Sequence, residues 1–272
     1  MDETIRKIQE VDREALQVFS EFCAAQNIRF FLRGGSVLGA VKYGGFIPWD
    51  DDLDVAVPRK DYEKLIRAAR GKLLGGKFRI NSYRYCPELH CYFPRMVLSE
   101  EERIRLDLPK TTNLGLHIMD IFPLDGAPDG RVHRKLYILH VYVLRVLASL
   151  GTHYTGSWVN MHSRKQELVI RICRLLRLDR LFPQRDVYAR LERLYRRYDW
   201  QKQAYAGTVT ASLFAKEIMP AEIWGQGAPA DFAGIAVTVP EQYDRYLRRL
   251  YGEDYMEVEP EEKDRKSHLG RK

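Results

Sequence analysis

Four aspartates within five positions, residues 50–52 and Asp54, constrain this chain more than any other feature, because apolar residues frame them on both sides. Trp49 precedes the run and residues 55–57, Val-Ala-Val, follow it. A solvated acidic loop needs neither neighbour. Crowded carboxylates at the mouth of a buried strand repel one another unless a cation lies among them. The run therefore predicts a divalent metal site, and aspartate oxygens favour Mg²⁺ or Mn²⁺ over Zn²⁺.

Residues 52–57 alternate with the period of two that is typical of a β-strand. Asp52 and Asp54 then share one face, and the apolar residues between and after them pack on the other. Two carboxylates so placed can bind one metal ion or bridge a pair.

The stretch Gly34-Gly35-Ser36 follows a second predicted strand, residues 29–32, and precedes a predicted short helix, residues 37–41. We expect a tight turn here, with Ser36 near the N-terminus of the helix. Backbone N–H groups at such a turn can hold a phosphate. A glycine pair alone also fits an ordinary strand-to-helix turn.

A third carboxylate comes from residues 116–125, an apolar strand with one charge inside it. Asp120 is the candidate, since an aspartate in a buried strand is costly unless it is paired or bound to metal. Asp125 follows Pro123, and we expect it to stabilise a turn.

The chain has 272 residues, with 45% hydrophobic and 30% charged, which is ordinary for a soluble globular protein. No apolar run of 18 residues is free of charge, and residues 1–4 open a charged amphipathic helix, which argues against a signal peptide. We expect a cytoplasmic protein with reduced cysteines.

The alternation of elements predicts an α+β fold with a mixed sheet and flanking helices. Residues 4–26 form an amphipathic helix, and residues 100–105 form a loop. We divide the chain into a catalytic core at 1–130, a basic helical insertion at 131–204 and a C-terminal block at 205–272 that completes the domain.

The insertion is strongly basic: residues 131–200 hold 15 Lys and Arg against 5 Asp and Glu. Four arginines recur at intervals of three, at Arg171, Arg174, Arg177 and Arg180. They predict either a surface for anionic lipid or polyanionic glycan, at the inner face of a membrane, or an ordinary solvated helix face. Nucleic-acid binding fits the net charge of +7, but no aromatic-basic RNA motif or helix-turn-helix accompanies it.

A zinc site is a minor alternative. Cys86, His90 and Cys91 are close in sequence, but no second ligand pair accompanies them. Incidental clustering explains them as well.

The glycine pair, the Asp-x-Asp strand and a later carboxylate together resemble the nucleotidyltransferase superfamily. Within it, residues 32–54 resemble the signature of the LicD family, which shares its domain with fukutin-related ribitol-phosphate transferases. Residues 119–126 resemble the second block of the family, and residues 239–244 and 250–256 resemble its C-terminal block. The resemblance covers nearly the whole chain.

The resemblance implies transfer of phosphocholine, or another phospho-alcohol, from a CDP-activated donor such as CDP-choline to a hydroxyl of a cell-envelope glycan (lipopolysaccharide, teichoic acid or capsule), with release of CMP. Asp52 and Asp54 would hold Mg²⁺ or Mn²⁺. Asp120 would complete the metal site or accept the proton of the attacking hydroxyl. Gly34, Gly35 and Ser36 would position the phosphates.

Other residues of the same stretch are candidates for the substrate. Arg33 and Lys42 suit phosphate, and Arg95, in a strand-like run after Pro94, suits the nucleotide. Trp49 suits a quaternary ammonium group. Asp50 and Asp51 would orient a metal-bound water or bind the cationic head group.

Two other functions stay open. A nucleotidyltransferase that modifies a small molecule would release pyrophosphate instead of CMP. A non-catalytic module that binds polyanions would keep its function after Asp52→Ala.

Overall fold

In the computed structural model, residues 3–149, 175, 182–211 and 214–259 are described. The helices are α1 (Glu3–Ala25), α2 (Gly34–Leu38), the π-helix η1 (Gly39–Tyr43), α3 (Arg59–Ala69), α4 (Glu100–Arg105), α5 (Arg131–Ser149), α8 (Gln184–Tyr195), α9 (Phe214–Glu217), the 3₁₀-helix η3 (Ala221–Ile223) and α10 (Tyr243–Tyr251). The strands are β1 (Phe31–Leu32), β2 (Leu53–Pro58), β3 (Phe78–Asn81), β4 (Arg95–Leu98), β5 (Leu116–Ala127), β6 (Tyr205–Gly207), β7 (Met219–Pro220), β8 (Ala228–Phe232) and β9 (Ile235–Val239).

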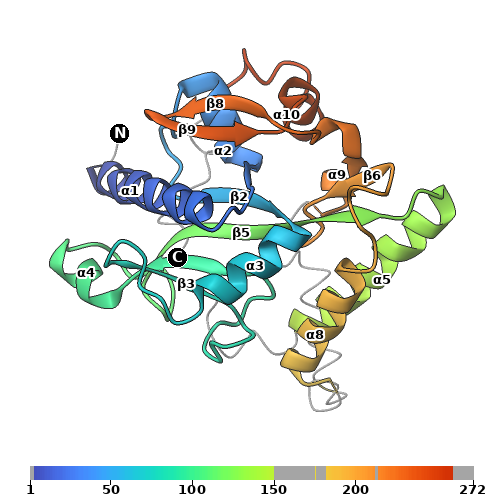
Figure 1. The fold of residues 1–272 in the computed structure, drawn as a ribbon, viewed down its shortest axis with the longest axis horizontal. Helices are drawn as coiled ribbons and strands as arrows, with labels where there is room; N and C mark the ends of the chain where they lie inside the picture. Colours follow the sequence, from blue (N-terminus) through green and yellow to red (C-terminus); the bar gives the residue numbers. More distant parts are fainter. Residues whose placement is uncertain (1–2, 150–174, 176–181, 212–213, 260–272) are drawn as a thin grey trace.

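A mixed sheet in the order β1-β2-β5-β4-β3 forms the centre of the molecule, and the α+β prediction is confirmed. β2 and β5 are parallel, and the other pairs along this order are antiparallel. The far end of β5 pairs with β6, which pairs with β7, while β8 and β9 form a separate hairpin (Figure 1). The second half of the chain thus adds β6 and β7 to the sheet, at the far end of β5.

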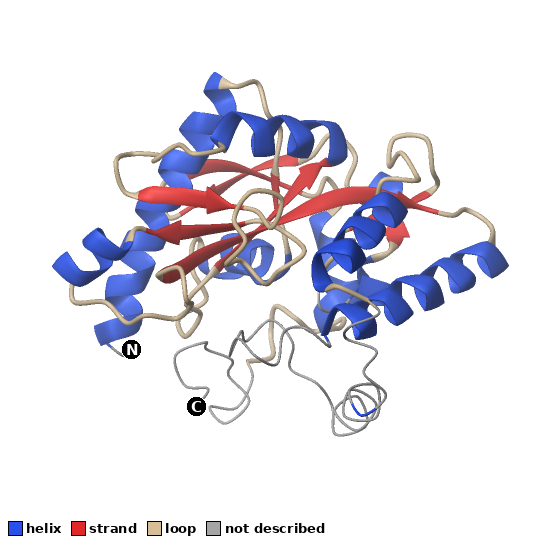
Figure 2. Cartoon of the chain, turned by 90° about the horizontal axis from the view of Figure 1, so that it is seen from below, coloured by secondary structure: helices blue, strands red, loops and turns tan. Residues whose placement is uncertain are grey.

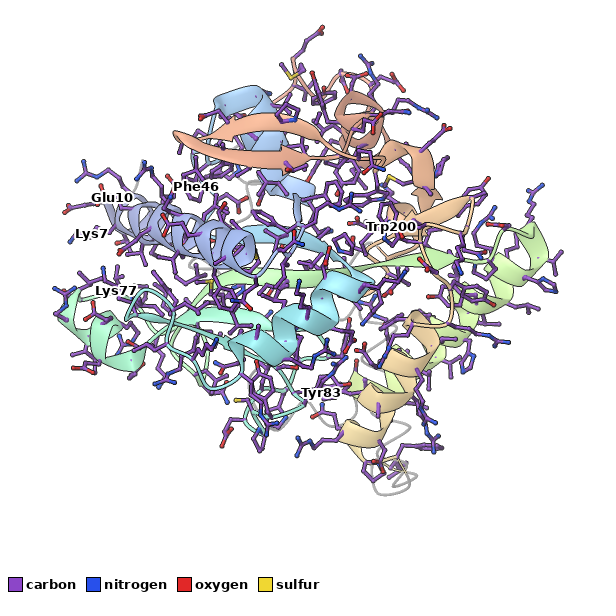
Figure 3. The ribbon with its side chains drawn as sticks, viewed as in Figure 1. Lys7, Glu10, Phe46, Lys77, Tyr83 and Trp200 are labelled. Carbon is purple, nitrogen blue, oxygen red and sulfur yellow. The ribbon has the colours of Figure 1, made fainter. Side chains whose placement is uncertain are left out.

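Helices α1 and α3 both pack on the central strands (Figure 1). Their buried faces, which include Leu16, Phe19 and Tyr62, share one core with Val55 and Ile121 of the sheet. The outward face of α1 carries charged side chains, among them Lys7 and Glu10 (Figure 3). The long amphipathic helix predicted for residues 4–26 is therefore present and packs as its pattern requires.

A second core cluster is richer in aromatic residues and lies between β5, α5 and α8. Its buried members include Tyr92, Phe93, Phe122, Tyr188 and Tyr195. Figure 2 shows α5 and α8 together at one end of the molecule. The predicted helical character of residues 131–197 holds for α5 and α8. Arg171, Arg174, Arg177 and Arg180 lie outside the described residues.

Three local predictions are wrong. Residues 100–105 form α4 instead of a loop, because Ser99 caps the helix by accepting a hydrogen bond from the Glu102 N–H, and three glutamates occupy its first turn. Asp125 lies inside β5 instead of in a turn. The helix after β1 begins at Gly34 itself, so the glycine pair is its first turn instead of a loop before it.

Candidate active site

The parallel pair β2 and β5 brings two of the predicted carboxylates together. Asp54 of β2 lies opposite Asp120 of β5 in the register of the sheet. Residues opposite each other in a sheet point to the same side. Asp52 is two positions before Asp54, just outside β2. The acidic run and the carboxylate predicted some 66 positions later thus meet at one place.

The glycine pair is needed because the carboxylates come so close to α2. Gly34 has φ +54°, and a Cβ there would lie 3.1 Å from Asp54 Oδ2. A Cβ on Gly35 would lie 3.1 Å from Asp50 Oδ2. A side chain at either position would push against a carboxylate of the acidic run.

Two of the groups predicted to hold phosphates make contacts within the protein. The Gly34 N–H donates to the hydroxyl of Tyr246 in α10, at 2.8 Å. Ser36 Oγ accepts a hydrogen bond from the Asp54 N–H at 2.9 Å. Ser36 therefore links α2 to β2 and fixes the position of the Asp54 backbone.

Arg33 contacts carboxylates. Its Nη1 donates to Asp54 Oδ2 at 2.8 Å, and its Nη2 donates to Glu217 Oε1. Thr208 holds the other oxygen of Glu217 at 2.8 Å. The Arg33 guanidinium carbon also lies 4.5 Å from the centroid of the Phe122 ring. A residue 184 positions away in sequence thus fixes the arginine beside Asp54.

Asp120 is held by Arg95 and His117. Arg95 Nε donates to Asp120 Oδ1 at 2.8 Å, and His117 Nε2 lies 2.8 Å from the same oxygen. His117 and Asp120 are three residues apart, which in a regular strand would place them on opposite faces. The pairing of β4 with β5 shifts between Met96 and Val97, so that Ile118 is skipped. This bulge brings His117 to the side of Asp120.

The electrostatics of the two aspartates differ. Burial raises the pKa of Asp54 to about 8, and Asp52 and Asp120 add to the rise while Arg33 opposes it. Burial works in the same direction on Asp120, but Arg95 and His117 hold the pKa of that carboxyl well below its usual range. Arg33, which is shared with Glu217, therefore offsets only part of the cost of charging Asp54, whereas Asp120 is well paired.

A further carboxylate adds to this excess of negative charge. Asp12 of α1 is fully buried, and neither of its oxygens has a hydrogen-bond partner among the residues that the structure describes. Burial raises its pKa well above the usual value, and the neighbouring residues 50–52 raise it further. A buried carboxylate without a partner is costly unless positive charge is supplied nearby.

The donor set fits a divalent cation. Each of the two paired aspartates uses one oxygen within the protein, and among the described residues nothing donates to Asp54 Oδ1 or Asp120 Oδ2. Oxygen ligands of this kind suit Mg²⁺ or Mn²⁺. In the described part of the chain, no three His, Cys, Asp or Glu side chains are already arranged around one point as a metal centre. Asp54 Oδ2 points to Arg33 instead.

The remaining predicted residues are spread around this centre. Asp51 is buried, and Asp50 approaches Gly35. Trp49 is half-buried and packs edge-on against Tyr43, with 6.3 Å between ring centroids. Lys42 points elsewhere: its Nζ donates to the carbonyls of Tyr255 and Val258, so it ties η1 to the C-terminal segment.

The three predicted zinc candidates have separate contacts. Cys86 Sγ lies 3.3 Å from a Glu88 oxygen, and His90 Nδ1 lies 3.0 Å from Gln184 Oε1. Cys91 is buried, which raises the pKa of its thiol to about 12.

Four residues of this region were not predicted from the sequence: Asp12, His117, Glu217 and Tyr246. His117 carried a signal, because it is a second polar residue in the otherwise apolar run 116–122. The other three come from α1, α9 and α10, and no local pattern links them to residues 33–54.

Comparison with known proteins agrees with this geometry. Residues 27–140 match the family model described as LicD/FKTN/FKRP, nucleotidyltransferase domain. The lipopolysaccharide cholinephosphotransferase LicD of Haemophilus influenzae is 26% identical over 274 residues, which cover 98% of this chain and 96% of that protein. The human and mouse ribitol 5-phosphate transferases FKRP are 29% identical over 104 residues, covering 38% of this chain and 20% of theirs.

Residues 27–140 are thus similar to the nucleotidyltransferase domain of the LicD family, the resemblance that the sequence predicted. This segment contains Asp54, Asp120 and the glycine pair, but neither Asp12 nor Glu217. Across the described residues, no helix is long and apolar enough to cross a membrane.

Proposed function

We propose that this LicD-family chain is a metal-dependent phosphotransferase that moves a phospho-alcohol from a CDP-activated donor to a hydroxyl of a cell-surface glycan. The observation that carries the proposal is the register of β2 and β5, which sets Asp54 opposite Asp120 beside the start of α2. The near full-length similarity to a lipopolysaccharide cholinephosphotransferase supports phosphocholine as the group transferred.

In the proposed reaction, the acceptor oxygen attacks the phosphorus that bears the alcohol. The bond from that phosphorus to the bridging oxygen breaks, CMP leaves with the bonding electrons, and a carboxylate of the site takes the hydroxyl proton. Attack at the other phosphorus would transfer the nucleotide instead. The choice between them depends on how the donor lies across residues 33–54.

Asp52, Asp54 and Asp120 would hold Mg²⁺ or Mn²⁺, which when bound neutralises charge on the phosphates. Of the two roles predicted for Asp120, metal ligand suits it better than base, because Arg95 and His117 hold its pKa well below the usual range. Arg33 sets the orientation of Asp54 through its hydrogen bond to Oδ2. Ser36 fixes the backbone of the same residue.

Tyr43 and Trp49 supply a place for a quaternary ammonium group. Both rings are half-buried and meet edge to face, next to the acidic run. Aromatic faces attract such cations, and the carboxylates of Asp50 and Asp51 would add to that attraction. CDP-choline would then lie with its head group on these rings and its phosphates toward Asp54.

Two observations bear on the other candidate functions. A nucleotidyltransferase acting on a small molecule would use the same aspartates, so only the product separates it from the phosphotransferase. A non-catalytic polyanion-binding module needs no buried carboxylates, and the cost of burying Asp54 and Asp12 counts against it.

The test is isothermal titration of the full chain with CDP-choline, CDP-ribitol, CTP and ATP, each with and without Mg²⁺. Metal-dependent binding of CDP-choline above the others supports the phosphocholine reaction, and CMP released in the presence of a glycan acceptor would complete it. Preference for CTP or ATP, with release of pyrophosphate, would overturn the proposal in favour of a nucleotidyltransferase.

A further inference from the structure

Helix α5 is apolar on two opposite sides. Its inner side, Tyr137, Val141, Leu144 and Ala148, is buried against α8 and the second core cluster. These residues follow one another by three or four positions, as one face of a helix requires. A helix at the surface of a protein normally has a polar outer side.

The outer side of α5 instead carries a stripe of aliphatic residues, also spaced by three or four positions. Its members are Val132 (69% exposed), Leu136 (58%), Leu139 (57%) and Val143 (47%). Tyr142, 41% exposed, adjoins the stripe. Single exposed apolar residues are ordinary, but a continuous row of four on one helix marks a contact surface.

The charge around the stripe is of one sign. No Asp or Glu occurs in Arg131–Ser149. Exposed Arg131 and Lys135 flank the stripe on one side, and exposed His133 and His140 flank it on the other. Among the described residues, neither Arg131 nor Lys135 forms an ion pair with an acidic side chain. An apolar row beside unpaired basic groups is complementary to an anionic surface that has an apolar interior.

The size of the stripe argues against a second copy of the chain as its partner. Val132 and Val143 are eleven residues apart, so the stripe is about 17 Å long at 1.5 Å per residue. A row one helix wide covers well under the roughly 800 Å² per partner of a stable protein interface. A bilayer needs no such area or shape match, because a helix lying in its surface needs only an apolar side and basic flanks.

We propose that α5 is a membrane-surface helix that docks the protein on a bilayer containing anionic lipids. Val132, Leu136, Leu139 and Val143 enter the acyl boundary, while Arg131 and Lys135 contact the headgroups. Figures 1 and 2 show α5 at one end of the molecule, with α4 at the other.

This surface is independent of the chemistry at Asp54. It lies on α5, whereas Asp54 and Asp120 belong to β2 and β5. Failure of the proposed transfer reaction would leave vesicle binding untouched. Loss of vesicle binding would likewise leave nucleotide binding at residues 33–54 untouched.

The test is co-sedimentation of the full chain with vesicles of phosphatidylcholine alone or mixed with phosphatidylglycerol. The double variant Leu136→Gln/Leu139→Gln removes two exposed apolar side chains, and we expect at least about a tenfold loss of binding to the mixed vesicles. Because both side chains are mostly exposed, the melting temperature should not move.

A matched control is available at the other end of the molecule. Ile104 of α4 is 63% exposed, and Ile104→Gln should bind vesicles as the unchanged protein does. Lys135→Glu should weaken binding to the mixed vesicles only.

The proposal fails if the unchanged protein does not bind mixed vesicles, if the Ile104→Gln control loses binding equally, or if the double variant binds fully. A concentration-dependent dimer that the double variant abolishes would also overturn it, by giving the stripe to a second copy of the chain.

Discussion

Arg33, which is buried, and Arg59, which is half-buried, both join carboxylates from distant parts of the chain, yet only one of them lies in a balanced cluster. Arg59 binds Asp125 through Nε at 2.7 Å and through Nη2, and its Nη1 reaches Glu192 of α8. Arg84 adds a second cation, which binds Glu63 at 2.7 and 2.9 Å and Glu192 at 2.9 Å. Each carboxylate there has an arginine.

The cluster at Arg33 is different. Arg33 divides its donors between Asp54 and Glu217, while Asp52, Asp120 and the buried Asp12 add further negative charge nearby. The pKa of Asp54 rises to about 8. Burial also raises the pKa of Asp125, but Arg59 opposes this rise, and the pKa reaches only about 6. β5 therefore has a closed ionic cluster at Asp125 and, five residues earlier, Asp120 beside a group of carboxylates in which negative charge exceeds positive charge.

The largest effect should follow from Asp54→Asn. Turnover should fall on the order of a thousandfold or more, because charge stabilisation at the phosphates is lost. Folding should survive or improve slightly, since repulsion among the aspartates falls. Steady-state kinetics and thermal melting measure the two effects. Asp107→Asn, at an exposed site with φ 50°, is the matched control. An active, metal-independent Asp54→Asn protein would contradict the mechanism.

Arg59→Met should have the opposite pattern, with a loss of stability and no loss of nucleotide binding. It leaves Asp125 buried without its partner, and breaking a buried pair from one side costs about 3–5 kcal/mol of the free energy of unfolding. Urea denaturation measures the loss. Nucleotide binding by the fraction that stays folded should be unchanged. If Arg59→Met instead reduced turnover with normal stability, the division between a structural and a reactive cluster would be wrong.

Glu217→Gln should have an intermediate effect. Arg33 loses its second carboxylate and should hold Asp54 more tightly, so metal affinity should fall about tenfold. Titration of Mg²⁺ measures this affinity, and excess Mg²⁺ should restore turnover. Thr208→Val, which removes only the hydrogen bond to Glu217 Oε2, should give a smaller loss. A loss that excess Mg²⁺ left unchanged would assign Glu217 to packing alone.

The smallest effect should be a gain of stability in Asp12→Asn that depends on pH. The pKa of Asp12 is raised on folding, so above pH 4 the folded state binds more protons than the unfolded state, and stability falls as pH rises. Asn removes this slope. At pH 8 without metal the variant should be about 1–2 kcal/mol more stable than the unchanged protein.

Denaturation at several pH values measures this difference, which should vanish near pH 4. Added Mg²⁺ should narrow it at pH 8, because a cation at the site offsets the same repulsion. A difference that did not vary with pH would show that folding does not raise the pKa of Asp12, and would contradict this prediction.

The sequence was informative where function depends on local pattern. The period of two after Asp52 predicted the face that Asp54 occupies, and the charge inside an apolar strand singled out Asp120. It failed at Asp125 for two reasons. Pro123, two residues earlier, is typical of a turn, and Arg59, the partner that stabilises the buried aspartate, is 66 residues away. His117 was missed because a bulge changes the alternation of β5.

Partners that come from far along the chain are hidden for the same reason. Nothing near Arg33 shows that it will be shared between Asp54 and Glu217, so its charge suggested phosphate instead. Which side chains meet at a site depends on how α9 and α10 return to α2, and that return has no local signature.

The ion pair between Arg33 and Glu217 can form only late in the synthesis of the chain. A ribosome releases Arg33 and the acidic run early, while Glu217 and Tyr246 emerge 184 and 212 residues after their partners. The nascent chain therefore carries residues 33–54 without these two partners until α9 and α10 have been made. Chains that stop before α9 would contain the family-model region, residues 27–140, and still lack Glu217, which holds Arg33 in place. Asp54 therefore gains its full set of neighbours only when the last quarter of the chain has been made.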